Sequence, residues 1–430
     1  QKEVKGDRVI TQYDMYDLDL NVNEEALGLL KMDFLGLRNL TILENAVRFV
    51  EKTKKEKLDL EKIPLDVKKV FDLITSGETT GIFQLESPGM RRLAKDLKPS
   101  KISDLSAMVA LFRPGPMAWI DEFISSKNHA KQINYLHPDI RPILEETYGI
   151  VMYQEQCMQL ANVMAGYTLA EADNFRKAIG KKKPELMKKE KDKFIKGCLK
   201  AGYSQKVADD VFSLIEKFVG YGFNKAHSAS YALIAYQTAY MKAHFAVEFM
   251  TAVLTAESRA SSGPTKNEKI SQAVAECKRL KIEVLPPDIN KSETEFRIED
   301  GKIRFGLSAI KNVGEAAIST ILQAREEKSF TNLSDFISRV DLSKVNRKTL
   351  ESFIKAGAMD SFGKRSSMLA SLHQLVSESS LARKREEKGQ ATLFDEPKNG
   401  KIDVQSNVVL IDIEEFSKEE KLSFEKEYLG

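Results

Sequence analysis

Cysteine and histidine are scarce in this sequence, and neither is clustered. Three cysteines, Cys157, Cys198 and Cys277, are spread over 430 residues, and no two form a Cys-x-x-Cys pair. The odd count and wide spacing exclude a disulfide framework and a zinc framework. The five histidines are equally scattered. We therefore expect a protein of a reducing compartment, the cytoplasm.

Long apolar runs are also missing. The most apolar stretch, residues 229–256, contains Lys242, His244 and Glu248, which a membrane span tolerates poorly. No secretory signal opens the chain, because residues 1–8 are polar and charged. We therefore expect no membrane association. The first residue is not Met and the last lies in an ordinary-looking segment, so we also expect an internal fragment.

Charge of one sign is not in large excess. The net charge is only +3, and 42% hydrophobic with 30% charged residues indicates a globular chain of about two to four domains. Positive charge is concentrated instead in residues 176–196, where ten basic residues oppose three acidic ones. This density suits phosphate neutralisation. A solvated helix face is the more common explanation of such a run.

Helical periodicity dominates the chain. Apolar residues recur at three- and four-residue spacing over residues 207–219, behind Ser204 as a candidate cap. Strand-like alternation is confined to residues 282–285, 296–298 and 303–305. The last two segments flank a turn at residues 299–301. We predict a mainly α fold with minor β structure (α+β, multidomain). The polar composition after about residue 376 indicates a surface segment or tether.

One carboxylate lies within an apolar, strand-like run at residues 30–37. Strand alternation places Lys31 and Asp33 on the same face. An isolated buried carboxylate is costly, so Asp33 needs a cation, a metal or strong hydrogen bonds. Spacing alone favours a structural ion pair with Lys31 or Arg38 over a metal site.

Three segments combine glycine with proline or aromatic residues. Residues 81–90 and 111–117 have the composition of rigid loops, and the second loop contains Arg113. Two tight turns with a surface arginine explain the composition equally well. The segment Tyr221-Gly-Phe-Asn-Lys-Ala-His-Ser228 could stack on a base and hold a phosphate. For His227, a structural hydrogen-bonding role is the more common alternative.

Residues 307–317 have the pattern helix, tight turn, helix. Asn312 stands where glycine is usual in a helix-hairpin-helix, and Gly314 precedes a helix whose backbone N–H groups could bind a phosphate. We expect a degraded second copy of this pattern at residues 350–360. A plain helical hairpin explains the pattern equally well.

The charged tail contains the short segment Gln390-Ala-Thr-Leu-Phe394. A glutamine with an apolar pair can dock on a partner while its charged flanks stay solvated. A match of this length is weak by itself, but exposed Leu393 and Phe394 in such polar surroundings need an explanation.

Together these segments resemble the family C replicative DNA polymerases, the alpha subunits of bacterial DNA polymerase III. The resemblance covers nearly the whole chain. Its motifs are KMDFLGLRNLT at 31–41, GIFQLES, ALFRPGPM, TYGIVMYQEQ at 147–156, FRKAIGKKKPE at 175–185, YGFNKAHSASYA and VLPPDIN at 284–290.

The resemblance implies a role for each candidate residue. Asp33 would be the third of three palm aspartates that hold two Mg²⁺ ions, the other two lying upstream of residue 1. Since one aspartate cannot place two ions, we expect the fragment alone to be inactive. Lys31, Arg113, Arg176 and Lys177 would contact the incoming triphosphate, with Lys225 and His227 as further nucleotide contacts. The DNA contacts would be Lys181, Lys182, Lys183, Lys311, Asn312 and Gly314, and the clamp-binding motif would be Gln390, Leu393 and Phe394.

The resemblance also implies a domain order and a set of partners. Residues 1–44 would end the palm, 45–290 form the fingers, 291–375 form a helix-hairpin-helix module, and 376–430 carry the clamp motif and a linker towards an OB domain. The partners would be primer–template DNA, deoxynucleoside triphosphates, the beta sliding clamp and other replisome subunits, with a clamp loader and a proofreading exonuclease as candidates. The alternative from another class is a non-catalytic DNA-binding adaptor in which Asp33 is structural.

Overall fold

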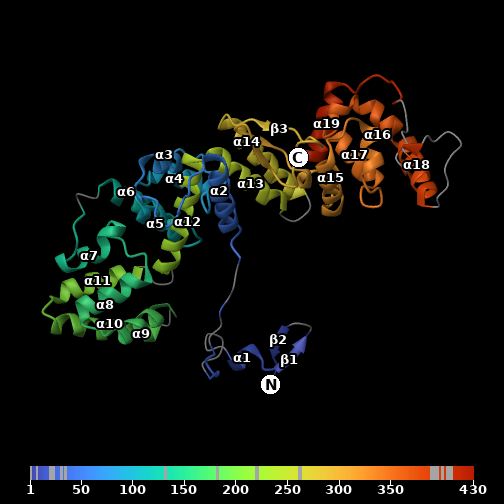
Figure 1. Ribbon diagram of the computed structural model, residues 1–430. Helices are drawn as coiled ribbons and strands as arrows, with labels where there is room; N and C mark the ends of the chain where they lie inside the picture. Colours follow the sequence, from blue (N-terminus) through green and yellow to red (C-terminus); the bar gives the residue numbers. More distant parts are fainter. Residues whose placement is uncertain are drawn as a thin grey trace. The chain divides into compact units, whose positions relative to one another are not determined.

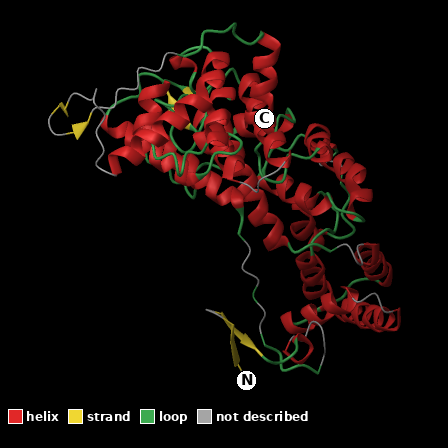
Figure 2. Ribbon diagram, turned by 90° about the vertical axis from the view of Figure 1, so that its right-hand side faces the viewer, coloured by secondary structure: helices red, strands yellow, loops and turns green. Residues whose placement is uncertain are grey.

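The computed structural model describes the chain except for residues 1, 6–7, 19–24, 30–31, 33–35, 130–132, 181–183, 218–221, 260–263, 388–396, 399–400 and 403–409. It divides into two compact units, Gln1–Arg38 and Asn39–Gly430. Helices predominate in the second unit, which confirms the mainly α fold with minor β structure (Figures 1 and 2).

The first unit contains a short β-hairpin and one helical turn. Strands β1 (Lys2–Lys5) and β2 (Arg8–Thr11) are antiparallel, with Lys2 opposite Thr11, and α1 (Met15–Leu18) follows. Lys31 and Asp33 lie outside the described residues, so the strand expected there stays a prediction.

In the second unit, one group of helices packs around the long helix α12 (Lys225–His244); we call it the α12 core. Its other members are α3 (Lys68–Thr75), α4 (Pro88–Leu97), α5 (Ile102–Leu111), η1 (Pro116–Trp119) and α6 (Ile120–Asn128). Helix α5 is buried from Asp104 to Leu111, because it packs along α12.

A second group, the α8–α11 cluster, has its own core. Its elements are η3 (Pro138–Ile140), α7 (Arg141–Leu144), η4 (Glu145–Thr147), α8 (Gln154–Ala165), α9 (Leu169–Gly180), α10 (Pro184–Lys200) and α11 (Gln205–Lys217). The rings of Phe175, Phe194 and Phe212 meet at its centre and are fully buried. The Ser204 hydroxyl accepts a hydrogen bond from the Val207 N–H at 3.3 Å, which confirms the predicted cap of α11.

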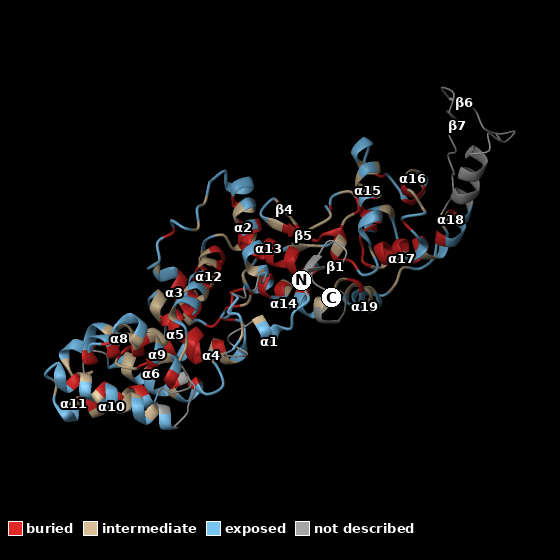
Figure 3. Ribbon diagram, turned by 90° about the horizontal axis from the view of Figure 1, so that it is seen from below, coloured by how far each residue is buried: buried red, intermediate tan, exposed pale blue. Residues whose placement is uncertain are grey.

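A third group combines helices with the small sheet. Helices α2 (Arg38–Lys54), α13 (Ala246–Arg259) and α14 (Pro264–Arg279) pack with strands β3 (Val284–Leu285), β4 (Arg297–Glu299) and β5 (Lys302–Arg304). Strand β5 is central, parallel to β3 and antiparallel to β4. Asp300 and Gly301 have positive φ, which confirms the predicted turn. Helix α13 is almost entirely buried (Figure 3).

The fourth group follows this sheet. It comprises η5 (Leu307–Ala309), α15 (Glu315–Glu327), α16 (Leu333–Arg339), α17 (Arg347–Lys355), η6 (Asp360–Phe362), α18 (Arg365–Glu387) and α19 (Lys418–Leu429). The short strands β6 (Pro397–Lys398) and β7 (Lys401–Ile402) lie between the last two helices.

The hairpin at residues 307–317 differs in part from the expected one. Its first helix is only a single 3₁₀ turn, because the backbone becomes extended at Ile310. Asn312 has φ 64°, which confirms the left-handed position predicted for it. Gly314 does not share that conformation; its backbone is extended, and it is the N-cap residue of α15.

The structure differs in part from the surface segment or tether expected after residue 376. Helix α18 continues to Glu387, and α19 packs against α17 with Tyr428 buried. The N–H of Lys311 donates to the carbonyl oxygen of Tyr428 at 3.0 Å. The start of α19 carries a Ser417–Glu420 capping box, a local signal that sequence reasoning missed. Residues Gln390, Leu393 and Phe394 lie outside the described residues.

Candidate functional site

A short backbone bridge joins the start of α8 to the segment before α12. The N–H of Gln154 donates to the carbonyl oxygen of Phe223 at 2.9 Å, and the N–H of Phe223 donates to that of Met152 at 3.2 Å. Tyr153 and Phe223 therefore pair in parallel. The bridge brings together two of the sequence motifs, residues 147–156 and 221–228.

Arg113 lies against this bridge. Its guanidinium carbon is 3.8 Å from the centroid of the Phe223 ring, while the side chain stays exposed. Such a cation–π contact is worth about 0.5–2 kcal/mol and fixes the plane of the arginine. Hydrogen bonds from the Arg113 N–H to Leu111 and from the Met117 N–H to Arg113 hold the loop, and Gly115 at φ 100° permits its turn. These bonds support the prediction of a rigid loop.

A row of rings extends from Phe223 along the start of α12. Ring centroids are 5.5 Å apart for Phe223 and His227, 4.1 Å for His227 and Tyr231, and 5.1 Å for Tyr231 and Phe83. Spacing of four residues places His227 and Tyr231 on one face of α12, while Phe223 comes just before the Asn224 cap. The side chain of Asn224 caps the helix by accepting from the His227 N–H at 2.8 Å. His227 is exposed, so its ring is accessible to a ligand.

Lys225 begins α12 and is paired with an acidic residue. Its ammonium lies 2.5 Å from a carboxylate oxygen of Glu146. Glu155 accepts from the backbone N–H of Lys225 at 2.9 Å and from the Asn224 side chain at 3.1 Å. Both ionised side chains of the Lys225–Glu146 pair are about two-fifths exposed, so solvent weakens the attraction.

Arg176 and Lys177 share one carboxylate on α9. Arg176 donates to Asp173 at 2.8 and 3.0 Å, and Lys177 lies 2.9 Å from the other oxygen. Hydrogen bonds from Lys177 and Arg176 hold the pKa of Asp173 below its usual value. A third bond runs from Arg176 to the side-chain oxygen of Gln154 at 3.1 Å. Arg176 is thereby tied to the backbone bridge.

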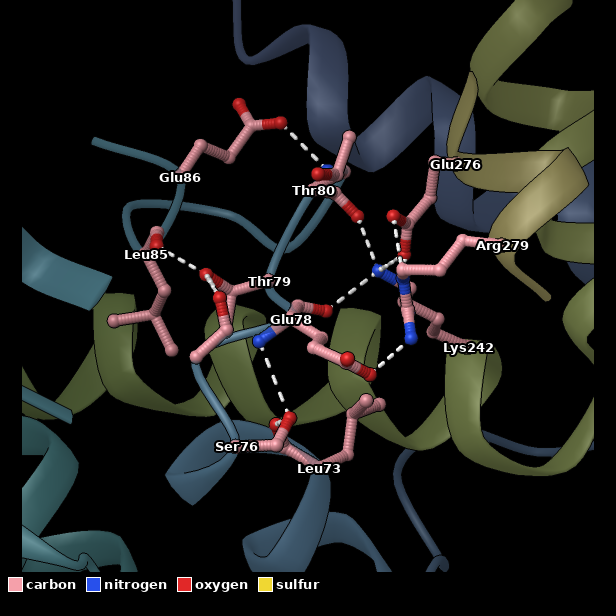
Figure 4. Close-up of polar contacts among 12 residues, drawn as sticks. Leu73, Ser76, Glu78, Thr79, Thr80, Leu85, Glu86, Lys242, Glu276 and Arg279 are labelled. Atoms are coloured by element: carbon pink, nitrogen blue, oxygen red, sulfur yellow. Dashed lines mark hydrogen bonds and ion pairs between the residues drawn. The ribbon is translucent and has the colours of Figure 1, made fainter. Parts of the chain in front are cut away.

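The motif at residues 81–87 lies on a loop clamped by Lys242 (Figure 4). The Lys242 side chain has no exposed surface, and its ammonium donates to the carbonyl oxygens of Glu78 at 2.8 Å and Thr80 at 2.7 Å. It also pairs with Glu276 at 2.6 Å, and Glu276 pairs with Arg279 at 2.7 Å. Burial lowers the pKa of Lys242. One buried cation thus joins the loop to α12 and α14.

Bonds within the loop add to this clamp. The Thr79 hydroxyl donates to the carbonyl oxygen of Leu85 at 2.5 Å, and the Gly81 N–H donates to the Glu86 carboxylate at 2.6 Å. The N–H of Phe83 donates to the Thr238 hydroxyl of α12 at 3.1 Å. These bonds support the prediction of a rigid loop, and they hold Phe83 at the end of the row of rings.

A separate group of predicted residues lies at the start of α15. The ammonium of Lys311 is 3.3 Å from Glu427 and half-exposed. The Asn312 side chain donates to the Ser352 hydroxyl at 3.3 Å, which secures the left-handed turn. A β-carbon at Gly314 would meet no atom within 4 Å, so the side-chain position at the start of α15 is open.

The predicted residues therefore fall into three sets. Arg113, Arg176, Lys225 and His227 meet around the bridge, and Lys177 joins them through Asp173. Lys311, Asn312 and Gly314 form the group at α15. The third set lies outside the described residues and consists of Lys31, Asp33, Lys181, Lys182, Lys183, Gln390, Leu393 and Phe394.

Two absences can be stated for the residues that the structure describes. They contain no group of three or more His, Cys, Asp or Glu side chains that could hold a metal ion. Within the same residues, no helix is both long and apolar enough to cross a membrane.

Two family models match the chain. Residues 39–202 match the bacterial DNA polymerase III alpha subunit finger domain, and residues 281–368 match a helix-hairpin-helix motif. Arg113, Arg176 and Lys177 fall within the first range, and the group at α15 falls within the second.

Curated relatives extend the match to nearly the whole chain. The chain is 46% identical over 395 residues to DNA polymerase III subunit alpha of Thermus aquaticus, and 45% identical over 424 residues to that of Bacillus subtilis. These alignments cover 90% and 98% of the chain. The chain corresponds to the region of DNA polymerase III alpha subunits that covers the fingers and the helix-hairpin-helix. The relative from Escherichia coli is 44% identical over 91% of the chain. The chain spans 31%, 36% and 34% of the length of these three polymerase subunits.

Proposed function

We propose that this chain supplies the nucleotide-binding fingers and a duplex-binding module of a polymerase that adds deoxynucleotides to a primer 3′ end. The observation that carries the proposal is the convergence of Arg113, Arg176, Lys225 and His227 on one backbone bridge. Nucleotidyl transfer develops charge on the triphosphate, which preorganised arginine and lysine side chains stabilise.

The acidic partners of these cations have a simple role in the proposal. Asp173 and Glu146 hold Arg176, Lys177 and Lys225 in place before a nucleotide arrives. A triphosphate carries more negative charge than one carboxylate, so it can take over these contacts at little reorganisation cost. The exposed ring of His227 and the adjoining row of rings offer a stacking surface for a base.

The metal part of the proposal rests on the family resemblance. Two Mg²⁺ ions, held by Asp33 and two further aspartates of a full-length enzyme, would supply activation of the primer hydroxyl. Asp33 lies outside the described residues, as does Lys31, the expected partner of the triphosphate. On this proposal the chain alone binds substrates but does not extend a primer.

The remaining proposals concern DNA and partner proteins. Lys311, Asn312 and Gly314 would contact duplex phosphates, while Lys181, Lys182 and Lys183 hold the template or primer backbone. The domain bounds 1–44, 45–290, 291–375 and 376–430 are part of the proposal. So are attachment of a beta sliding clamp through Gln390, Leu393 and Phe394, and association with a clamp loader and a proofreading exonuclease in the cytoplasm.

Equilibrium nucleotide binding tests the proposal. A full-length alpha subunit carrying this sequence is bound to a primer–template whose primer ends in a dideoxynucleotide, so that binding is measured without chemistry. We expect Arg113→Ala and Arg176→Ala to weaken dATP binding by about 5- to 100-fold each. Arg141→Ala is the matched control, because Arg141 is an exposed arginine of the same α8–α11 cluster. Unchanged dATP affinity in both variants, with normal DNA binding, would favour the adaptor.

A further inference from the structure

We infer that Gln154 is a positioning residue that couples Arg176 to Arg113 across the backbone bridge. The inference rests on the proposed function, because it assigns to Gln154 the mutual placement of two proposed triphosphate contacts. Gln154 is the first residue of α8 and is half-buried between α9 and the segment before α12.

Gln154 uses its backbone and both ends of its side chain. Its N–H donates to the Phe223 carbonyl oxygen at 2.9 Å, and its side-chain amide donates to the Gly222 carbonyl oxygen at 3.0 Å. Its side-chain oxygen accepts from Arg176 at 3.1 Å. Arg113 in turn lies 3.8 Å from the Phe223 ring. A continuous chain of contacts therefore runs from one arginine to the other.

The hydrogen-bonding needs of Arg176 and Gly222 favour glutamine at position 154. A guanidinium only donates hydrogen bonds and a carbonyl oxygen only accepts them, so the residue between Arg176 and Gly222 must accept on one side and donate on the other. A primary amide meets both needs in one orientation. Glutamate would keep the contact to Arg176 but lose the donor to Gly222, and methionine would lose both.

The backbone just before Gln154 is held by hydrogen bonds. The side-chain oxygen of Gln156 accepts from the N–H groups of Met152 at 2.9 Å and Tyr153 at 3.0 Å. The amide of Gln154 therefore projects from an anchored helix start. A displacement of either arginine is transmitted to the other through the bridge, so their contributions to triphosphate binding should not be additive.

The test is a double-mutant cycle on the complex with the dideoxy-terminated primer. The dissociation constant of dATP is measured for Arg113→Ala, Arg176→Ala and the double variant, with glutamine and with Gln154→Met. We expect Gln154→Met alone to weaken binding by about 5- to 30-fold. With glutamine at position 154, the effect of the double variant on the dATP dissociation constant should differ by at least about threefold from the product of the two single effects. With Gln154→Met, the two single effects should multiply.

Two further variants make the test specific. Gln154→Glu should leave dATP binding within about threefold of Gln154→Met, because the donor to Gly222 is still missing. If Gln154→Met does not fold, Gln154→Glu carries the same cycle. Gln205→Leu is the control, since Gln205 is exposed and, among the described residues, its side chain donates to Asp209 one turn further along α11. This variant should leave the coupling intact.

The outcomes separate this inference from the proposed function. If neither arginine variant weakens dATP binding, the proposed function fails. If both weaken it but the coupling survives in Gln154→Met, or Gln154→Glu restores full affinity, only the inference on Gln154 is overturned.

Discussion

The Lys242 clamp leads to a prediction that can be worked from its contacts. Lys242→Met keeps the length of the side chain but removes its charge and its donors. The carbonyl oxygens of Glu78 and Thr80 then lose the ammonium as a donor, and Glu276 keeps its ion pair with Arg279. Because a single member of a buried pair is removed, the loss is not offset by apolar packing.

The expected loss follows from these contacts. Hydrogen bonds to a charged group are worth about 1.5–3 kcal/mol each, and breaking a buried pair costs about 3–5 kcal/mol. The contacts share one ammonium and are not additive, and Arg279 still neutralises Glu276, so we expect a loss of about 3–5 kcal/mol in total.

Urea unfolding of the chain measures this loss. Trp119 is the single tryptophan of the sequence and packs against the α12 core, so its fluorescence reports on that core. With a slope of about 3 kcal/mol per molar, the midpoint should fall by about 1–2 M. Lys69→Met is the control, since Lys69 is exposed on α3 of the same core and should change stability by under about 0.5 kcal/mol. A similarly small shift for Lys242→Met would refute the clamp.

Three other predictions concern the thiols, the chemistry and the clamp. Burial raises the pKa of Cys157 to about 12, Cys198 to about 11 and Cys277 to about 12. The native thiols should therefore resist a disulfide reagent that labels all three in urea. The thiols of the unfolded chain ionise near their usual pKa of 9.0. The stabilisation that comes from burying neutral thiols is therefore complete below pH 9 and is lost as the pH rises towards the pKa values of the folded protein. A urea midpoint that does not fall above pH 9 would contradict this expectation. The isolated chain should not extend a primer at saturating nucleotide and Mg²⁺, and templated incorporation by the chain would overturn this claim. In a full-length subunit, Asp33→Asn should abolish extension while leaving DNA binding nearly intact. Titration against a bacterial sliding clamp should show weaker binding after Leu393→Ala with Phe394→Ala, because two apolar side chains contribute about 3–6 kcal/mol before ordering costs; equal affinities would remove the motif assignment.

Local patterns in the sequence predicted the local structure well. The apolar spacing of residues 207–219 gave α11 and its Ser204 cap, and the Asp300–Gly301 turn lies where polar turn residues separate two alternating runs. Asn312 adopts the left-handed conformation expected of the residue that replaces glycine. Each of these features depends on neighbours within a few residues of each other.

Long-range partners could not be predicted in the same way. Gln154 meets Arg176 across 22 residues and Glu146 meets Lys225 across 79, so no spacing rule signals either contact. The burial of Tyr428 likewise depends on packing against α17, which the charged sequence of α19 conceals. Asp173 was missed because a carboxylate three residues before an arginine is typical of any exposed helix.

The central claim is that the cations around the bridge bind the triphosphate. Single-nucleotide incorporation by a full-length alpha subunit, compared for Arg176→Ala and Arg141→Ala with each of the four nucleotides, tests it most directly. Loss of a charge-assisted contact worth about 1.5–3 kcal/mol predicts that Arg176→Ala lowers catalytic efficiency by about 10- to 150-fold, equally for all four nucleotides. Unchanged efficiency, or a loss confined to one nucleotide, would contradict the claim.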